Sequence, residues 1–84
     1  MDTTIYTIPE RCPHCRALKR YLDSIGVKYT EEDMTTPASL TELRINGVFA
    51  TAAPVIQVGD RFIEYNEIFD GDVIRKDVIR EAVS

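Results

Sequence analysis

The stretch from Thr3 to Gly26, TTIYTIPERCPHCRALKRYLDSIG, decides how this chain folds. Residues 3–8 are all β-branched or aromatic, which predicts a strand that ends at Pro9. Residues 13–25 then carry apolar side chains at the spacing of one helix face, namely Leu18, Tyr21, Leu22 and Ile25. A strand therefore leads into a helix, and both cysteines of the chain lie where that helix is expected to start.

Residues suited to helix ends mark the next boundaries. Pro13 fits a first helical turn, where a missing backbone N–H costs nothing, and Gly26 fits a C-terminal cap. A second strand is predicted over residues 27–32. The sequence Thr35-Thr36-Pro37 predicts the start of a second helix, because a hydroxyl cap is followed by proline, and Gly47 is expected to end it. The residues of this helix expected to face the core are Leu40 and Leu43.

The last third of the chain predicts a hairpin and a final helix. Residues 54–58 and 61–64 are expected to be strands joined by the two-residue turn Gly59-Asp60. Asp70-Gly71-Asp72 is expected to precede the last helix and cap it. The inward residues of that helix are expected to be Val73, Ile74, Val78 and Ala82.

The expected order is β-α-β-α-β-β-α in one domain over residues 1–84. Crossover helices in the first half require parallel strands, and the tight turn requires an antiparallel pair. The sequence therefore predicts an α/β fold with a mixed four-stranded sheet flanked by three helices. In open sheets of this class, ligands bind beyond the carboxyl ends of the strands, which is where the cysteine pair is expected.

Charge and hydropathy narrow the classes of function. The 84 residues include 10 basic and 14 acidic side chains, for a net charge of -4, which argues against a nucleic-acid partner. No apolar run approaches the roughly 20 residues of a membrane span. The N-terminus has no basic stretch followed by an apolar one, so it does not read as a secretion signal. A cytoplasmic protein without a membrane partner is expected.

The spacing of Cys12 and Cys15 favours chemistry over a structural role. A disulfide between them closes a very short loop and would constrain the unfolded chain little. A thiolate is the nucleophile of disulfide exchange, and a helix N-terminus stabilises it through free N–H groups and the helix dipole. Arg11 and Arg16 would add positive charge. We therefore expect Cys12 to attack and Cys15, one turn into the helix, to resolve the mixed disulfide.

Three other interpretations of the pair stay open at this point. Half of a zinc site would need further ligands, and only His14 and carboxylates are at hand. A cysteine pair without function is the second, and a redox-inert interaction module is the third. His14 itself is either an exposed bystander or a tuning residue, because a protonated imidazole beside Cys12 would favour the thiolate and make the pair a stronger oxidant.

The ordered residues Ile5-Tyr6-Thr7, Cys12-Pro13-His14-Cys15 and Ala53-Pro54-Val55, followed by a glycine-containing hairpin, resemble the glutaredoxin family. The resemblance implies a thioredoxin-like fold and a disulfide oxidoreductase that works in cell redox homeostasis. It also implies a cis bond before Pro54 and a backbone at Ala53 that binds the substrate peptide; without it, the residues alone would read as an ordinary strand start. The substrate-binding set it implies is Arg11, Pro13, His14, Ala53, Pro54 and Asp72.

Departures from the family pattern leave the electron donor open. Glu64-Tyr65-Asn66-Glu67 stands where the family usually has a Gly-Gly pair and acidic residues that hold glutathione. The reductant is therefore either glutathione or a thioredoxin-type reductase, as in glutaredoxin-like electron donors of ribonucleotide reductase. The expected partners are disulfide-containing proteins, the expected state is a monomer, and neither a metal nor a bound cofactor is needed. An iron–sulfur cluster carrier of the same family is the alternative.

The proposed role of His14 can be tested by His14→Tyr, which restores the residue usual in the family. We expect the Cys12 thiolate to form at higher pH in the variant, because the imidazolium charge is lost. Thiolate absorbance measured against pH reports the change. Identical titration curves for the two proteins would rule out a tuning role.

Overall fold

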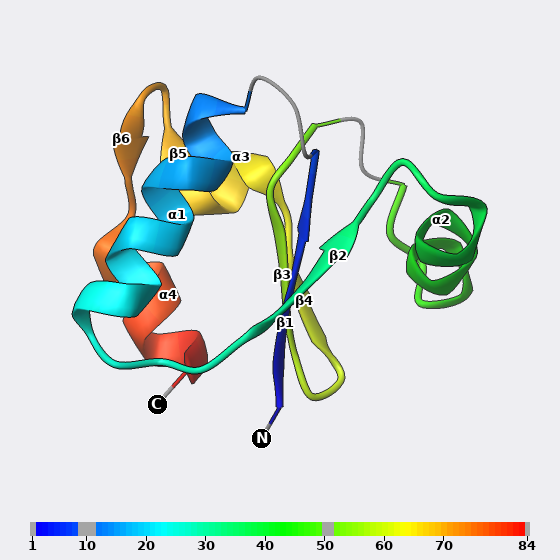
Figure 1. The fold of residues 1–84 in the computed structure, drawn as a ribbon, viewed down its shortest axis with the longest axis horizontal. Coiled ribbons are helices and arrows are strands. Elements are labelled where there is room, and N and C mark those ends of the chain that lie inside the picture. The colour runs from blue at the N-terminus through cyan, green and yellow to red at the C-terminus, as the bar shows by residue number, and fades with distance from the viewer. Residues whose placement is uncertain (1, 9–11, 50–51, 84) are drawn as a thin grey trace.

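The computed structural model describes residues 2–8, 12–49 and 52–83. The chain alternates strands and helices up to β3, which β4 follows directly, and shorter elements come next (Figure 1). In chain order the elements are β1 (Thr3–Thr7), α1 (Pro13–Ser24), β2 (Thr30–Asp33), α2 (Pro37–Ile45), β3 (Val55–Val58), β4 (Arg61–Ile63), α3 (Tyr65–Ile68), β5 (Phe69–Asp70), β6 (Val73–Ile74) and α4 (Lys76–Val83).

A four-stranded sheet in the order β2-β1-β3-β4 forms the centre of the fold. β1 runs parallel to β2 and antiparallel to β3, and β3 and β4 form the antiparallel hairpin. Figure 1 shows the sheet nearly edge-on, with α1 and α4 on one side and α2 on the other. The predicted mixed sheet is confirmed, and its central strand β1 leads toward the start of α1.

Two apolar clusters fill the space on the two sides of the sheet. Successive residues of a strand point to opposite faces, so the neighbours Ile5 and Tyr6 belong to different clusters. Ile5 pairs with Ile56 and packs with residues of α1 and α4, including Leu18, Leu22 and Ile79. Tyr6 packs on the side of α2, in a cluster completed by Cys15, Met34, Leu43, Val48, Ala53 and Val55.

The second helix begins as the sequence predicts. Thr36 caps it, because its Oγ1 accepts a hydrogen bond from the Ser39 backbone N–H at 3.2 Å, and Pro37 occupies the first turn. Leu43 is buried, Leu40 is half-buried, and the helix ends at Ile45 before the positive-φ residue Gly47.

The C-terminal segment differs from the prediction. The described residues form four helices rather than three, and Asp70 ends β5 while Gly71-Asp72 form the turn of a β5–β6 hairpin instead of capping the last helix. Gly71 has a φ of 63°, which this turn requires. Val73, expected to face inward, is 70% exposed on β6. Strands of two residues leave no periodic pattern, so the helical spacing predicts the wrong element here. β2 is also shorter than predicted and begins at Thr30.

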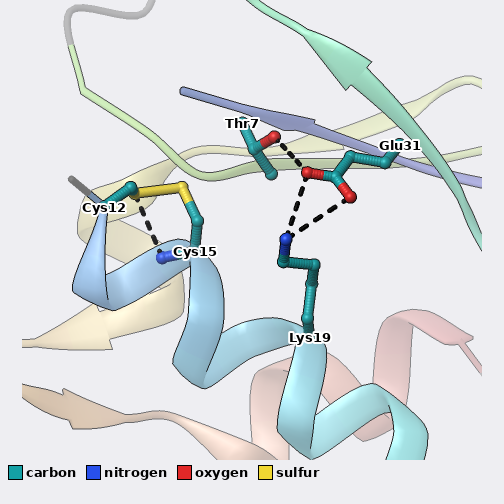
Figure 2. Close-up of polar contacts among 5 residues, drawn as sticks. All are labelled: Thr7, Cys12, Cys15, Lys19 and Glu31. Atoms are coloured by element: carbon teal, nitrogen blue, oxygen red, sulfur yellow. Dashed lines mark hydrogen bonds and ion pairs between the residues drawn. A yellow bond between two sulfur atoms is a disulfide. The ribbon is translucent and has the colours of Figure 1, made fainter. Parts of the chain in front are cut away.

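A polar network ties α1 to the sheet near its first turn. Thr7 is almost fully buried, and its Oγ1 donates a hydrogen bond of 2.7 Å to a carboxylate oxygen of Glu31 on β2. Lys19 of α1 donates to both oxygens of the same carboxylate at 3.2 and 3.4 Å. Figure 2 shows Thr7, Glu31 and Lys19 together beside the Cys12–Cys15 turn. The network therefore joins β1, β2 and α1.

Replacing Glu31 with Gln should make stability less dependent on pH. The hydrogen bond from Thr7, followed by that from Lys19, lowers the pKa of Glu31 below its ordinary value of 4.5, against the opposing effect of burial. A lowered pKa gives stability that is full above that ordinary value and is lost as the pH falls through the folded-state pKa. The side chain is 38% exposed, so water screens the pair, and we expect a loss of about 0.5 kcal/mol at neutral pH.

Urea unfolding of wild type and Glu31→Gln at neutral and acidic pH measures this difference, which should disappear in acid. Glu32→Gln is the matched control, because it removes the same charge from the opposite face of β2. Equal pH dependence of the Glu31 and Glu32 variants would show that the network does not stabilise the fold.

Candidate active site

The two cysteines form a disulfide at the start of α1. Their Cα atoms are 5.2 Å apart, and the side chain of Cys15 is buried while that of Cys12 is half-buried. Cys12 is the N-cap of the helix, and its Sγ accepts a hydrogen bond from the Cys15 backbone N–H at 3.1 Å (Figure 2). The Cys12 sulfur is therefore the more accessible of the two and lies against the helix N-terminus.

The surroundings of Cys12 favour a negative charge on sulfur once the disulfide is reduced. The first N–H groups of a helix lack intrahelical partners, and the dipole gives this end a partial positive charge. Pro13 occupies the first turn, which contains no acidic side chain. Cys15 lies in the apolar cluster that also contains Ala53 and Val55, where burial favours the neutral thiol. The two sulfurs are thus placed in different electrostatic environments.

The peptide bond between Ala53 and Pro54 is cis, as the family resemblance implies. Pro54 is fully buried, and Ala53 belongs to the same cluster as Cys15 and Val55. Cys12 packs against this cluster. The loop before β3 and the disulfide turn therefore meet on one side of the sheet, although they are distant in sequence.

The side chain of His14 does not extend freely into solvent. Its Nε2 lies 3.1 Å from a carboxylate oxygen of Asp72 and 3.5 Å from the hydroxyl of Tyr65. Its ring meets the rings of Tyr65 and Phe69 edge-on, with centroids 5.1 and 4.7 Å apart. The sequence pointed to His14 and Asp72 separately, but it gave no sign that they meet or that the two aromatic rings join them.

The other predicted site residues have varied positions. Pro13 and Arg16 are exposed at the start of α1. Arg11 and Pro9 lie outside the described residues. The substrate-binding roles expected for Arg11, Pro13, His14, Ala53, Pro54 and Asp72 stay predictions. Over residues 2–8, 12–49 and 52–83, no group of three or more His, Cys, Asp or Glu residues could hold a metal ion.

Tyr6, on the α2 side of the sheet, was not predicted as a polar site residue. Burial, followed by the nearby charges of Glu42 and Glu32, raises the pKa of its hydroxyl. The hydroxyl therefore stays protonated and donates a hydrogen bond of 2.8 Å to the side-chain oxygen of Gln57. This contact links β1 to β3 and is structural.

In the part of the chain that the structure describes, no helix has the length and apolar character needed to span a membrane.

Comparison with known proteins gives the chain its family. The glutaredoxin family model matches residues 3–63. No curated protein matches the sequence. Among solved structures, a mutant of the thioredoxin-like protein BC3987 has a TM-score of 0.73 at 17% identity, covering 99% of this chain and 100% of that one. BC3987 without the mutation has a TM-score of 0.68 at 17% identity, covering 96% of this chain and 99% of that one.

These matches agree with the geometry of the site. The structural neighbours share the thioredoxin-like fold, which confirms the fold class predicted from the sequence. The family match and the bonded cysteine pair support a thiol–disulfide oxidoreductase. Since the family model covers most of the sequence, from the first strand to the end of the hairpin, this chain belongs to the glutaredoxin family.

Proposed function

We propose that this protein is a dithiol oxidoreductase that reduces protein disulfides through Cys12 and Cys15. One observation carries the proposal. The half-buried Cys12 sulfur accepts a helix N-terminal N–H bond, while its partner Cys15 is buried. A nucleophile that is accessible and stabilised as a thiolate, followed by a protected second thiol, is what dithiol exchange requires.

The first step joins Cys12 to the substrate through a mixed disulfide. The Cys12 thiolate attacks one sulfur of the substrate disulfide, and a mixed disulfide between Cys12 and the substrate forms. The substrate's own S–S bond breaks, and its second sulfur leaves as a thiolate that takes a proton from water. The N–H groups that held the charge on Cys12 become available again for the step that follows.

The second step releases the substrate. The Cys15 thiol loses its proton to solvent, and its sulfur attacks the Sγ of Cys12. The mixed disulfide breaks, the substrate leaves as a thiolate that is then protonated, and the Cys12–Cys15 bond seen in the structure forms. The substrate has gained two electrons and two protons in all. The protein has lost two electrons and the Cys15 proton, and solvent supplies the other proton because Cys12 reacts as a thiolate. Because Cys12 is stabilised as a thiolate, it is also a good leaving group when the protein is reduced again.

We place the substrate peptide beside the loop that ends at Pro54. This loop packs with Cys15 and against Cys12, so a peptide bound to the Ala53 backbone would present its sulfur to Cys12. Pro13 and His14 would contact the peptide from the other side. The proposal thus keeps the substrate-binding set expected from the family resemblance.

We propose that a reductase with its own dithiol supplies the electrons in preference to glutathione. Glu64-Tyr65-Asn66-Glu67 follows β4 where the family usually has a Gly-Gly pair and acidic residues that hold glutathione. Acidic residues are present here but the glycine pair is not, and the ring of Tyr65 packs against His14 instead. An iron–sulfur cluster carrier remains the alternative class, which the purification described below distinguishes from a dithiol reductase.

The order of attack is tested by trapping. Cys15→Ser should capture a disulfide substrate as a stable mixed disulfide on Cys12, because no second thiol is present to release it. Cys12→Ser, the matched control, should capture none, since Cys15 is buried. Mass spectrometry of both variants after reaction with a model disulfide measures this. Capture by Cys12→Ser alone would reverse the two roles, and a brown protein from anaerobic purification would favour the cluster carrier.

The electron donor is tested by two coupled assays of the same model disulfide. One assay contains glutathione with its reductase, and the other contains a thioredoxin-type reductase. We expect faster turnover with the thioredoxin-type reductase. Faster turnover with glutathione in the wild type would overturn the choice of donor.

A further inference from the structure

The residues that hold His14 all come from the end of the chain. Tyr65 begins α3, Phe69 begins β5, and Asp72 lies in the turn between β5 and β6. These residues follow the segment matched by the glutaredoxin model, which ends at residue 63. In Figure 1 the β5–β6 hairpin stands beside the first turn of α1. A part of the chain beyond the matched segment therefore contacts the turn that carries both cysteines.

The contacts fix both the plane and the edge of the His14 ring. Phe69 and Tyr65 meet it at interplanar angles of 77° and 81°. The Phe69 and Tyr65 rings stack on each other, with centroids 5.7 Å apart, so they form one surface. Asp72 then binds Nε2 at 3.1 Å. Packing sets where the ring lies, and the carboxylate sets which nitrogen is turned toward the hairpin.

This arrangement differs from an ordinary surface ion pair. Two exposed side chains gain little from pairing, since both must lose conformational freedom. Here the His14 side chain is only 28% exposed and is held by two rings before Asp72 contributes, although the Asp72 side chain is 99% exposed. The freedom lost on pairing is therefore mainly that of one short side chain.

We propose that Asp72 is a positioning residue of the redox site, which acts through His14 to hold a positively charged ring beside Cys12. This inference rests on the proposed function, because it assigns the hairpin a part in the same disulfide chemistry. His14 is one of the two residues between Cys12 and Cys15 in sequence. Its charge favours the Cys12 thiolate, and the hairpin keeps that charge in place.

The sign of the effect separates this proposal from simple electrostatics. A carboxylate near a thiolate disfavours it, so the loss of either hairpin aspartate would by itself favour the Cys12 thiolate. If Asp72 acts through His14, its loss must instead weaken the thiolate. Among the described residues, the ionisable groups that contact the ring are Asp72 from the hairpin and Tyr65 from α3. Cys12, Cys15 and Arg16 are its ionisable neighbours in sequence at the start of α1.

The experiment compares two variants that each lose one charge from the same hairpin. Asp72→Asn removes the charge that contacts His14, and Asp70→Asn removes the charge at the other end of the turn. The rate at which iodoacetamide alkylates Cys12 of the fully reduced protein is measured across the pH range in which histidine titrates. Where His14 is charged in the wild type, we expect Asp72→Asn to slow alkylation about two- to five-fold, and Asp70→Asn to leave it equal or slightly faster.

A second pair of proteins shows whether His14 carries the effect. His14→Phe keeps a ring against Tyr65 and Phe69 but has no nitrogen for Asp72 to bind. In that background Asp72→Asn should no longer slow alkylation. His14 is the only histidine of the chain, so its ring signals in nitrogen NMR are unambiguous. These signals should change in Asp72→Asn and stay as in the wild type in Asp70→Asn.

Two results would overturn the proposal. One is faster or unchanged alkylation in Asp72→Asn, and the other is slowing that persists in the His14→Phe background. Both readouts use the reduced protein and need no disulfide substrate. A failure of the trapping experiment would therefore remove the proposed function while the alkylation rates still reported whether Asp72 acts through His14.

Discussion

The hydrogen bond from the Cys15 backbone N–H to Cys12 Sγ joins the chemistry of this protein to its fold. It forms at the first turn of α1, where Cys12 is the helix N-cap. The position of the cap in turn depends on the central strand, which is held between β2 and β3. An N-cap sulfur accepts the hydrogen bond that a serine or aspartate oxygen would accept at another helix. The bond is stronger when the sulfur carries a negative charge.

The two faces of the sheet have different roles around this bond. Ile5, Leu18 and Ile79 hold α1 against α4 and keep the helix axis in place. Cys15 belongs to the second cluster together with Ala53, so the cluster that buries the second sulfur also contains the residue before Pro54. The Thr7–Glu31–Lys19 network adds a polar tie across β1, β2 and α1. Both apolar clusters and the polar network therefore contact α1, the helix that begins at the cysteine pair.

Local patterns were enough to predict the matched segment of the chain. Residues that are adjacent in sequence determine each of these features: the alternating strands and helices, the Thr36 cap, the hairpin turn and the helix start at Cys12. The cis peptide before Pro54 could be expected only from resemblance, since the residues alone also fit an ordinary strand start. The end of the chain differs from its prediction because Val73 and Ile74 fit one helix face as well as they fit a two-residue strand.

Contacts between residues that are distant in the chain could not be predicted from the sequence. His14 and Asp72 are 58 positions apart, and nothing in either neighbourhood indicates the other. Their meeting depends on the β5–β6 turn, which directs Asp72 back toward α1, and on the Tyr65–Phe69 surface that receives the ring. The matched segment supplies the two sulfurs and the helix end that act on a disulfide. Tyr65, Phe69 and Asp72 follow that segment and contact the site at His14, one of the two residues between the cysteines.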